Sequence, residues 1–150
     1  MHTELEGGCL CGRLRYRITQ APIDAGFCHC RLCQRASGAP VLAWLTVAIS
    51  GFDYRRGTPA AFDSSPHSQR EFCPHCGTQL AFRRRQHATT VDVTLASLDH
   101  PARLAPQYHI WRQSRIDWFE TADALPRYEN AGPDHHGDAL TGPDSATPSG

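Results

Sequence analysis

Polar and apolar side chains alternate along several short stretches of this chain. The stretch 13–19, RLRYRIT, alternates over its whole length, which is the pattern of a strand with one buried face. In the stretch 89–98, Val91, Val93 and Leu95 fall on one side of an extended backbone. We therefore predict a strand in each of these two stretches.

Two further stretches extend this β pattern. Residues 39–49 are apolar and partly β-branched, with Pro40 near the beginning, as expected for a central strand. Residues 71–82 indicate a strand, a tight turn at CPHC and a second strand. One short helix is expected at about 30–36. The sequence thus predicts a mainly β fold of antiparallel sheets with little helix.

The composition of the chain changes near residue 130. Residues 131–150 are rich in Gly, Pro, Asp, Ser, Thr and Ala and offer almost no apolar side chain to bury. Such a segment cannot offset the entropy of ordering its backbone. We therefore expect one folded domain at 1–130, followed by a disordered tail at 131–150.

The charged residues exclude several classes of function. The chain has 15 basic and 15 acidic side chains, and all the basic ones are arginine. Without lysine, Schiff-base chemistry and a Walker-A phosphate loop are excluded. The zero net charge argues against nucleic acid as a partner. No apolar run approaches the roughly 18 residues of a membrane span, and the first residues do not resemble a secretory signal, so we expect a cytoplasmic protein.

The seven cysteines carry the most specific chemical signal in the sequence. An odd number of cysteines in a reducing compartment does not indicate a disulfide framework. Residues this close in sequence are poorly placed to pair with each other, but a turn can direct two thiolates at one ion. Zinc is the metal that such thiolate sets favour. The cysteines form three clusters: Cys9 with Cys11, Cys28 with Cys30 and Cys33, and Cys73 with Cys76.

Only one division of these clusters gives a four-ligand and a three-ligand site while keeping each cluster whole. The four-thiolate set would be a closed, structural zinc site, and the three-thiolate set would leave one position open, as catalytic zinc does. This predicts two Zn²⁺ per chain. A single structural zinc with three incidental cysteines remains the alternative. The structural set is Cys9, Cys11, Cys73 and Cys76, and the catalytic set is Cys28, Cys30 and Cys33.

Three motifs resemble those of the glutathione-dependent formaldehyde-activating enzyme family, whose relatives include centromere protein V. They are GGCLCG at 7–12, CHCRLCQRASG at 28–38 and FCPHCG at 72–77. The resemblance covers about 5–130 and includes all seven cysteines. It implies a β-tent fold of several small coiled antiparallel sheets and two zinc ions, with the same division of ligands into a structural and an active site.

The resemblance also implies an activity and its partners. The family joins formaldehyde to glutathione and is classed with the carbon–sulfur lyases, so the expected partners are a small-molecule thiol and a small electrophile. The alternative is a non-catalytic, zinc-stabilised module that binds protein or nucleic acid, for which the arginine run 83–85 is the best support. The sequence leaves open whether the chain forms a homo-oligomer.

Four residues are candidates for further roles at an open zinc site. His29 and His109 are candidates for proton transfer, because imidazole titrates near neutral pH. Arg31 and Arg35 could bind a substrate carboxylate through paired hydrogen bonds. Each of the four could equally be a packing or surface residue. His29 is not expected to be a zinc ligand, since neighbouring side chains of an extended segment diverge.

Overall fold

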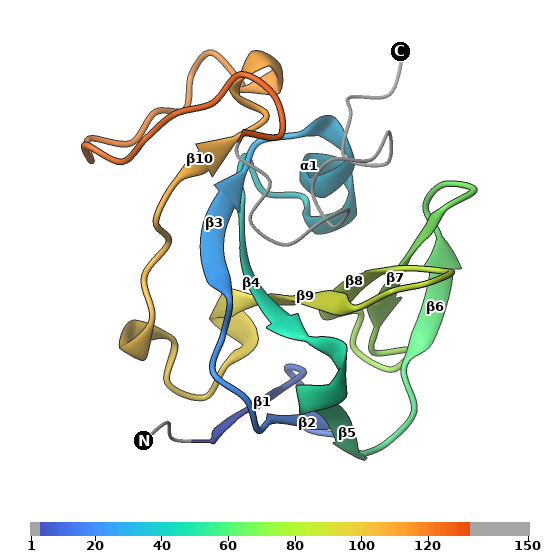
Figure 1. Ribbon diagram of the computed structural model, residues 1–150. Helices are drawn as coiled ribbons and strands as arrows, with labels where there is room; N and C mark the ends of the chain where they lie inside the picture. The colour runs from blue at the N-terminus through green and yellow to red at the C-terminus, as the bar shows by residue number, and fades with distance from the viewer. Residues whose placement is uncertain (1–3, 133–150) are drawn as a thin grey trace.

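The computed structural model describes residues 4–132, and their strands form two sheets (Figure 1). The smaller sheet is antiparallel, in the order β1 (Leu5–Gly8), β2 (Arg15–Ile18) and β5 (Phe52–Arg56). The larger sheet has the order β10 (His109–Ile110), β3 (Asp24–Cys28), β4 (Leu42–Ala48), β9 (Thr90–Thr94), β8 (Gln79–Arg84), β7 (Ser68–Phe72) and β6 (Ala60–Asp63). Its pairs are antiparallel except β10 with β3, which are parallel.

The mainly β fold predicted from the sequence is confirmed. The predicted strands at 13–19, 39–49 and 89–98 correspond to β2, β4 and β9, each shorter than its stretch. Strand β9 ends early because the chain turns into a 3₁₀-helix at Leu95–Ser97. The stretch 71–82 contains the end of β7, a turn and β8. The predicted tail at 131–150 lies outside the described residues except for its first two.

The helix expected at 30–36 is α1 (Arg31–Ser37), the one α-helix among the described residues. Cys30 is its N-cap, and the Cys30 Sγ accepts a hydrogen bond from the backbone N–H of Cys33 at 3.3 Å. Gly38 ends the helix in the left-handed region at φ 72°, which glycine adopts without a Cβ clash. No helix of residues 4–132 is long and apolar enough to span a membrane.

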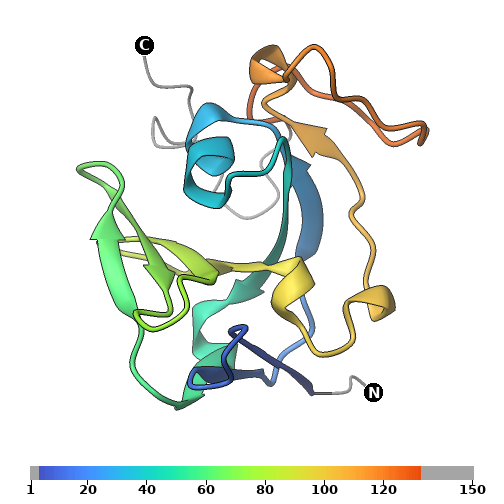
Figure 2. The same cartoon turned by 180° about the vertical axis from the view of Figure 1, so that it is seen from behind.

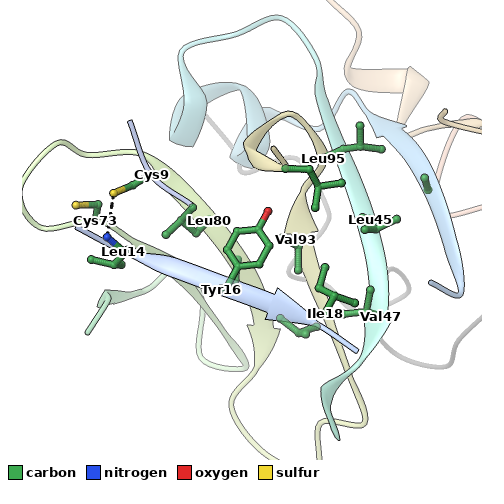
Figure 3. Packing of buried hydrophobic residues seen from close by; sticks show 14 residues of the cluster. Cys9, Leu14, Tyr16, Ile18, Leu45, Val47, Cys73, Leu80, Val93 and Leu95 are labelled. Atoms are coloured by element: carbon green, nitrogen blue, oxygen red, sulfur yellow. Dashed lines mark hydrogen bonds between the residues drawn. The ribbon is translucent and has the colours of Figure 1, made fainter. Parts of the chain in front are cut away.

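One face of the larger sheet packs against the smaller sheet and forms the main core. Tyr16 and Ile18 of β2 lie against Val47 of β4 and Val93 of β9, and all four are buried (Figure 3). Full burial of an aliphatic side chain contributes roughly 1.5–3 kcal/mol. This core therefore fixes how the two sheets lie against each other.

The opposite face of the larger sheet is polar and aromatic. Successive side chains alternate between the faces of a strand, so residues next to core positions point away from the core. Strand pairing places five of them in one row across β3, β4, β9, β8 and β7: Asp24, Thr46, Asp92, Phe82 and Arg70. Helix α1 and the smaller sheet lie at opposite ends of the molecule in both views (Figures 1 and 2). The large sheet thus separates the core from a second, chemically different region.

Candidate metal centres and active site

The first cysteine cluster joins the two sheets. Cys9 and Cys11 lie in the connection between β1 and β2, and Cys73 and Cys76 lie in the turn between β7 and β8. The four Sγ atoms lie within 4.8 Å of one another, with Cys11 Sγ 3.6 Å from Cys9 Sγ and 3.8 Å from Cys73 Sγ. Figure 3 shows Cys9 and Cys73 side by side at one end of the core. This cluster can hold a metal ion.

Hydrogen bonds from the backbone and from Thr78 favour the thiolate form of the cysteines in this cluster. The N–H groups of Leu14 and His75 lie 3.2 Å and 3.4 Å from the Sγ atoms of Cys9 and Cys73. The side-chain and backbone hydrogen bonds of Thr78 lower the pKa of Cys76 to about 5. A donor that faces sulfur favours the ionised form, which is the form that binds metal.

The second cluster is built where β3 meets α1. Cys28 ends β3, Cys30 caps the helix, and Cys33 lies in its first turn. All three side chains are buried, and their Sγ atoms lie within 4.8 Å of one another. The Sγ atoms of Cys28 and Cys33 are 3.5 Å apart. This cluster can therefore also hold a metal ion, and it offers three protein ligands.

Two of the three buried thiols, those of Cys33 and Cys28, have opposite tendencies to ionise. Hydrogen bonds from Cys28 and Cys30, together with the charge of Arg70, hold the pKa of Cys33 well below its usual range. The hydrogen bonds with Cys30 and Cys33, and burial, raise the pKa of Cys28. Like charges this close cannot all form without a compensating cation. The cluster thus needs a cation to hold three thiolates.

A small cavity with about 10 Å³ of free space adjoins the second cluster. Its lining comes from β3, α1 and the polar face of the sheet: Cys28, Cys30, Cys33, Trp44, Arg70, Phe82 and Asp92. This volume is about the space of one water molecule and far below the roughly 300–1,000 Å³ of ordinary ligand pockets. Without rearrangement, the cavity therefore admits only a group of about that size.

Arg70 is a buried cation in the wall of this cavity. Its guanidinium lies 5.0 Å from the ring centre of Phe82 and 6.0 Å from that of Trp44. The Nη2 and Nη1 atoms lie 3.7 Å and 3.9 Å from Cys33 Sγ, and Nε has no hydrogen-bond partner among the described residues. No carboxylate of the described residues forms an ion pair with Arg70, so its charge is directed at the sulfur cluster.

Asp92 is the buried carboxyl of the same cavity. Its Oδ1 accepts a hydrogen bond from Thr46 Oγ1 at 2.6 Å, and the residue is 2% exposed. Burial raises the pKa of Asp92 to about 7, against the opposing hydrogen bond from Thr46. A carboxyl in this environment can hold or release a proton near neutral pH.

The two histidines predicted for proton transfer lie next to each other. His29 Nε2 is 2.9 Å from His109 Nδ1, and His109 Nε2 is 3.1 Å from Asp123 Oδ1. Burial lowers the pKa of His29 to about 4 and also lowers that of His109. Neither ring lines the cavity. His29 thus points away from the sulfur atoms of its neighbours Cys28 and Cys30, toward β10.

The arginines singled out in the sequence lie elsewhere. Arg31 and Arg35 are on α1, and neither lines the cavity; the Arg31 guanidinium donates to Gln34 Oε1 at 2.7 Å. In the run 83–85, Arg83 pairs with Glu71 and Arg85 with Asp63. Arg83 and Arg85 therefore serve internal ion pairs, and the run does not present three free cations to a partner.

Arg70 and Asp92 are the site residues that sequence reasoning missed. Asp92 lies between two core valines in an alternating strand, a position that would normally face solvent. Arg70 precedes the CPHC turn and carries no motif. Only the pairing of β7, β8 and β9 brings these two residues to the cysteines.

Comparison with known proteins identifies similar chains. The family described as "Glutathione-dependent formaldehyde-activating enzyme" matches residues 4–114. A protein of Halomonas elongata, named as a candidate glutathione-dependent formaldehyde-activating enzyme, is 25% identical over 126 residues, which cover 77% of this chain and 80% of the relative. An uncharacterised lyase of Schizosaccharomyces pombe is 28% identical over 79 residues, covering 53% of this chain and 57% of its own. A solved Rhodobacter sphaeroides protein has a TM-score of 0.49 and 19% identity, covering 82% of this chain and 98% of its own.

Proposed function

Because the chain belongs to the glutathione-dependent formaldehyde-activating enzyme family, we propose that it is a zinc-dependent enzyme of the carbon–sulfur lyase type. It adds a thiol, glutathione or a similar one, to formaldehyde or a related small electrophile. The observation that carries this proposal is the cluster of Cys28, Cys30 and Cys33, three buried thiols beside a small cavity with its own cation and carboxyl.

The donor sets support zinc in both clusters. Four ligands at 2.3 Å in a tetrahedral arrangement lie about 3.8 Å apart. The Sγ separations of 3.6 Å and 3.8 Å in the first cluster and 3.5 Å in the second fit this spacing. Cys9, Cys11, Cys73 and Cys76 would close a structural site, whereas the second cluster leaves a fourth position for an exogenous thiol. When bound there, Zn²⁺ would supply a thiol-binding position and favour the thiolate.

The protein side chains determine which electrophile can approach this position. Trp44 and Phe82 make the cavity largely apolar, and its small volume excludes bulky carbonyl compounds. Arg70 supplies a positive charge for an oxygen that gains negative charge as the C–S bond forms. The cavity therefore favours a small aldehyde, with the body of the thiol remaining outside.

This proposal is tested by measuring the rate of thiol addition directly. Exchange NMR with ¹³C-formaldehyde and glutathione would compare the zinc-loaded protein with the spontaneous reaction at the same pH. We expect acceleration in proportion to protein concentration, and its loss in Cys30→Ser. A zinc-loaded protein, with two ions per chain, that leaves the spontaneous rate unchanged would contradict the proposed activity. Free Zn²⁺ at the same concentration is the control.

A further inference from the structure

The wall of the cavity carries a carboxyl that the proposed function does not yet use. Asp92 projects from β9 on the face away from the core, between Thr46 of β4 and Phe82 of β8. It is almost completely buried, yet it lines the same cavity as Cys28, Cys30 and Cys33. A buried carboxyl is costly unless it is hydrogen-bonded, paired or protonated, and Asp92 accepts one hydrogen bond, from Thr46.

The charged groups around Asp92 come from three elements. Asp24 on β3 and Cys33 on α1 disfavour its carboxylate form, and Arg70 on β7 favours it. Burial has the largest effect, and the hydroxyl of Thr46 opposes it by donating to the carboxylate. These effects together bring the pKa of Asp92 to about 7, where a group can both accept and donate a proton at neutral pH.

We propose that Asp92 is the proton carrier of this cavity: it accepts the proton of the incoming thiol and returns it to the carbonyl oxygen of the electrophile. Arg70 stabilises the charge on that oxygen in between. This inference rests on the proposed function, since it assigns a residue to the same reaction.

The proposed step balances without any further reactant. The S–H bond of the thiol breaks, and its proton moves to the Asp92 carboxylate. The sulfur electron pair forms the C–S bond, and the C=O π pair moves onto oxygen. The Asp92 carboxyl then gives its proton to that oxygen, which leaves a hydroxymethyl thioether and the original carboxylate. One thiol and one aldehyde are consumed, with no net proton released.

The geometry distinguishes Asp92 from the histidines predicted for the same task. Asp92 lines the cavity, whereas His29 and His109 do not. The Nε2 atom of His29 is directed at His109, and His109 continues to Asp123. A proton that passed between the thiol and either imidazole would have to leave the cavity.

The first test compares three variants of the zinc-loaded protein in the exchange experiment. Asp92→Asn retains an oxygen for Thr46 and should lower the catalysed rate by about 100-fold, a typical contribution of general acid–base catalysis. Asp53→Asn is the matched control, since Asp53 is exposed and, within residues 4–132, forms an ion pair with Arg55 alone. His109→Gln tests whether the proton instead passes through the histidine pair, in which case this variant and not Asp92→Asn would lose the catalysed rate. An Asp92→Asn protein of undiminished rate that binds two zinc ions overturns the inference, and the proposed function stands.

A second test changes the pKa of Asp92 without touching the carboxyl. Thr46→Val removes the hydrogen bond that favours the carboxylate, so the rise of the catalysed rate with pH should move to higher pH. If Asp92 has only a structural role, the catalysed rate should depend on pH in the same way in Thr46→Val as in the unsubstituted protein.

A third measurement does not depend on turnover. The ¹³C signal of the Asp92 carboxyl, assigned by its loss in Asp92→Asn, should titrate near neutral pH in the zinc-loaded protein and respond to glutathione. A midpoint below pH 5 overturns the inference even if the enzyme is active. If the zinc-loaded protein does not accelerate thiol addition at all, the proposed function fails and this inference fails with it, whereas an active enzyme with a midpoint below pH 5 overturns the inference alone.

Discussion

Two buried ionisable residues show how single side chains in this protein carry a cost in folding free energy. Arg70 is 6% exposed and has an unpartnered Nε, and Asp92 is 2% exposed with one hydrogen bond, from Thr46. Groups of this kind cost folding free energy unless they are paired. Residues that shape a reactive site often carry such a cost.

Replacing Asp92 should therefore stabilise the protein in a pH-dependent way. The pKa of Asp92 is raised from 3.8 to about 7 on folding, so its penalty is absent below the unfolded pKa and increases as pH rises toward the folded pKa. An asparagine at this position does not ionise, so its contribution to the free energy of unfolding does not change with pH. The advantage of Asp92→Asn in free energy of unfolding should grow by about 1 kcal/mol between pH 6 and pH 8, since each pKa unit corresponds to roughly 1.4 kcal/mol. Urea titrations of both zinc-loaded proteins would measure it, and an equal difference at both pH values would contradict the raised pKa.

At the scale of elements, strand β3 connects the three-cysteine cluster to the larger sheet. Cys28 is its last residue, and Gly26 lies two positions earlier on the same face. A Cβ at Gly26 would collide with the ring of Tyr108. The Tyr108 hydroxyl donates to Asp24 Oδ1 at 2.9 Å, which holds the segment leading to β10 against β3. The absent side chain at position 26 thus allows this segment to lie directly against β3.

Gly26→Ala should accordingly destabilise this part of the fold. Overpacking of a tight site costs typically 1–3 kcal/mol, and we expect a lower melting temperature together with weaker retention of one metal ion, since β3 also positions Cys28. Thermal melting followed by circular dichroism and zinc analysis would measure both effects. The double variant Gly26→Ala/Tyr108→Ala is the control, because removal of the ring should make the alanine much less costly. If the losses of stability in the two single variants simply add up in the double variant, the clash with Tyr108 is not the cause.

At the scale of the whole molecule, the two cysteine clusters have different structural positions. The first cluster joins residues 62 positions apart, Cys11 and Cys73, and connects the smaller sheet to the larger one. A metal ion there closes a long loop and adds its binding free energy to folding. The second cluster lies within 28–33, so its ion crosslinks only neighbouring parts of the chain.

Serine variants of the two clusters should therefore differ in their consequences. Cys73→Ser should unfold or aggregate, because the connection between the sheets is lost. Cys30→Ser should remain folded with one zinc per chain, since serine is itself a good N-cap for α1. Elemental analysis and thermal melting of both variants would decide the matter. A soluble Cys73→Ser protein that melts cooperatively, or a Cys30→Ser protein that loses both ions, would show that the two sites do not have these separate roles.

The sequence alone was sufficient to predict the elements whose signal is local. Strands β2, β4 and β9 follow from apolar runs or alternation, and α1 was expected after the second cysteine cluster. The predicted division of the cysteines comes from counting, because only one four-plus-three division keeps each cluster whole. The structure brings together the same four and the same three sulfur atoms.

The tertiary structure decided what surrounds those sulfur atoms. Arg70 and Asp92 have no local pattern that distinguishes them from solvent-facing residues, and Arg31 and Arg35, which are near the cysteines in sequence, do not line the cavity. The physical reason is that a cavity wall is assembled by strand pairing across the sheet, between β7, β8, β9 and β4. Spacing along the chain identifies cysteines that can share an ion with their near neighbours, whereas the pairing of distant strands determines which charges face the three-cysteine cluster.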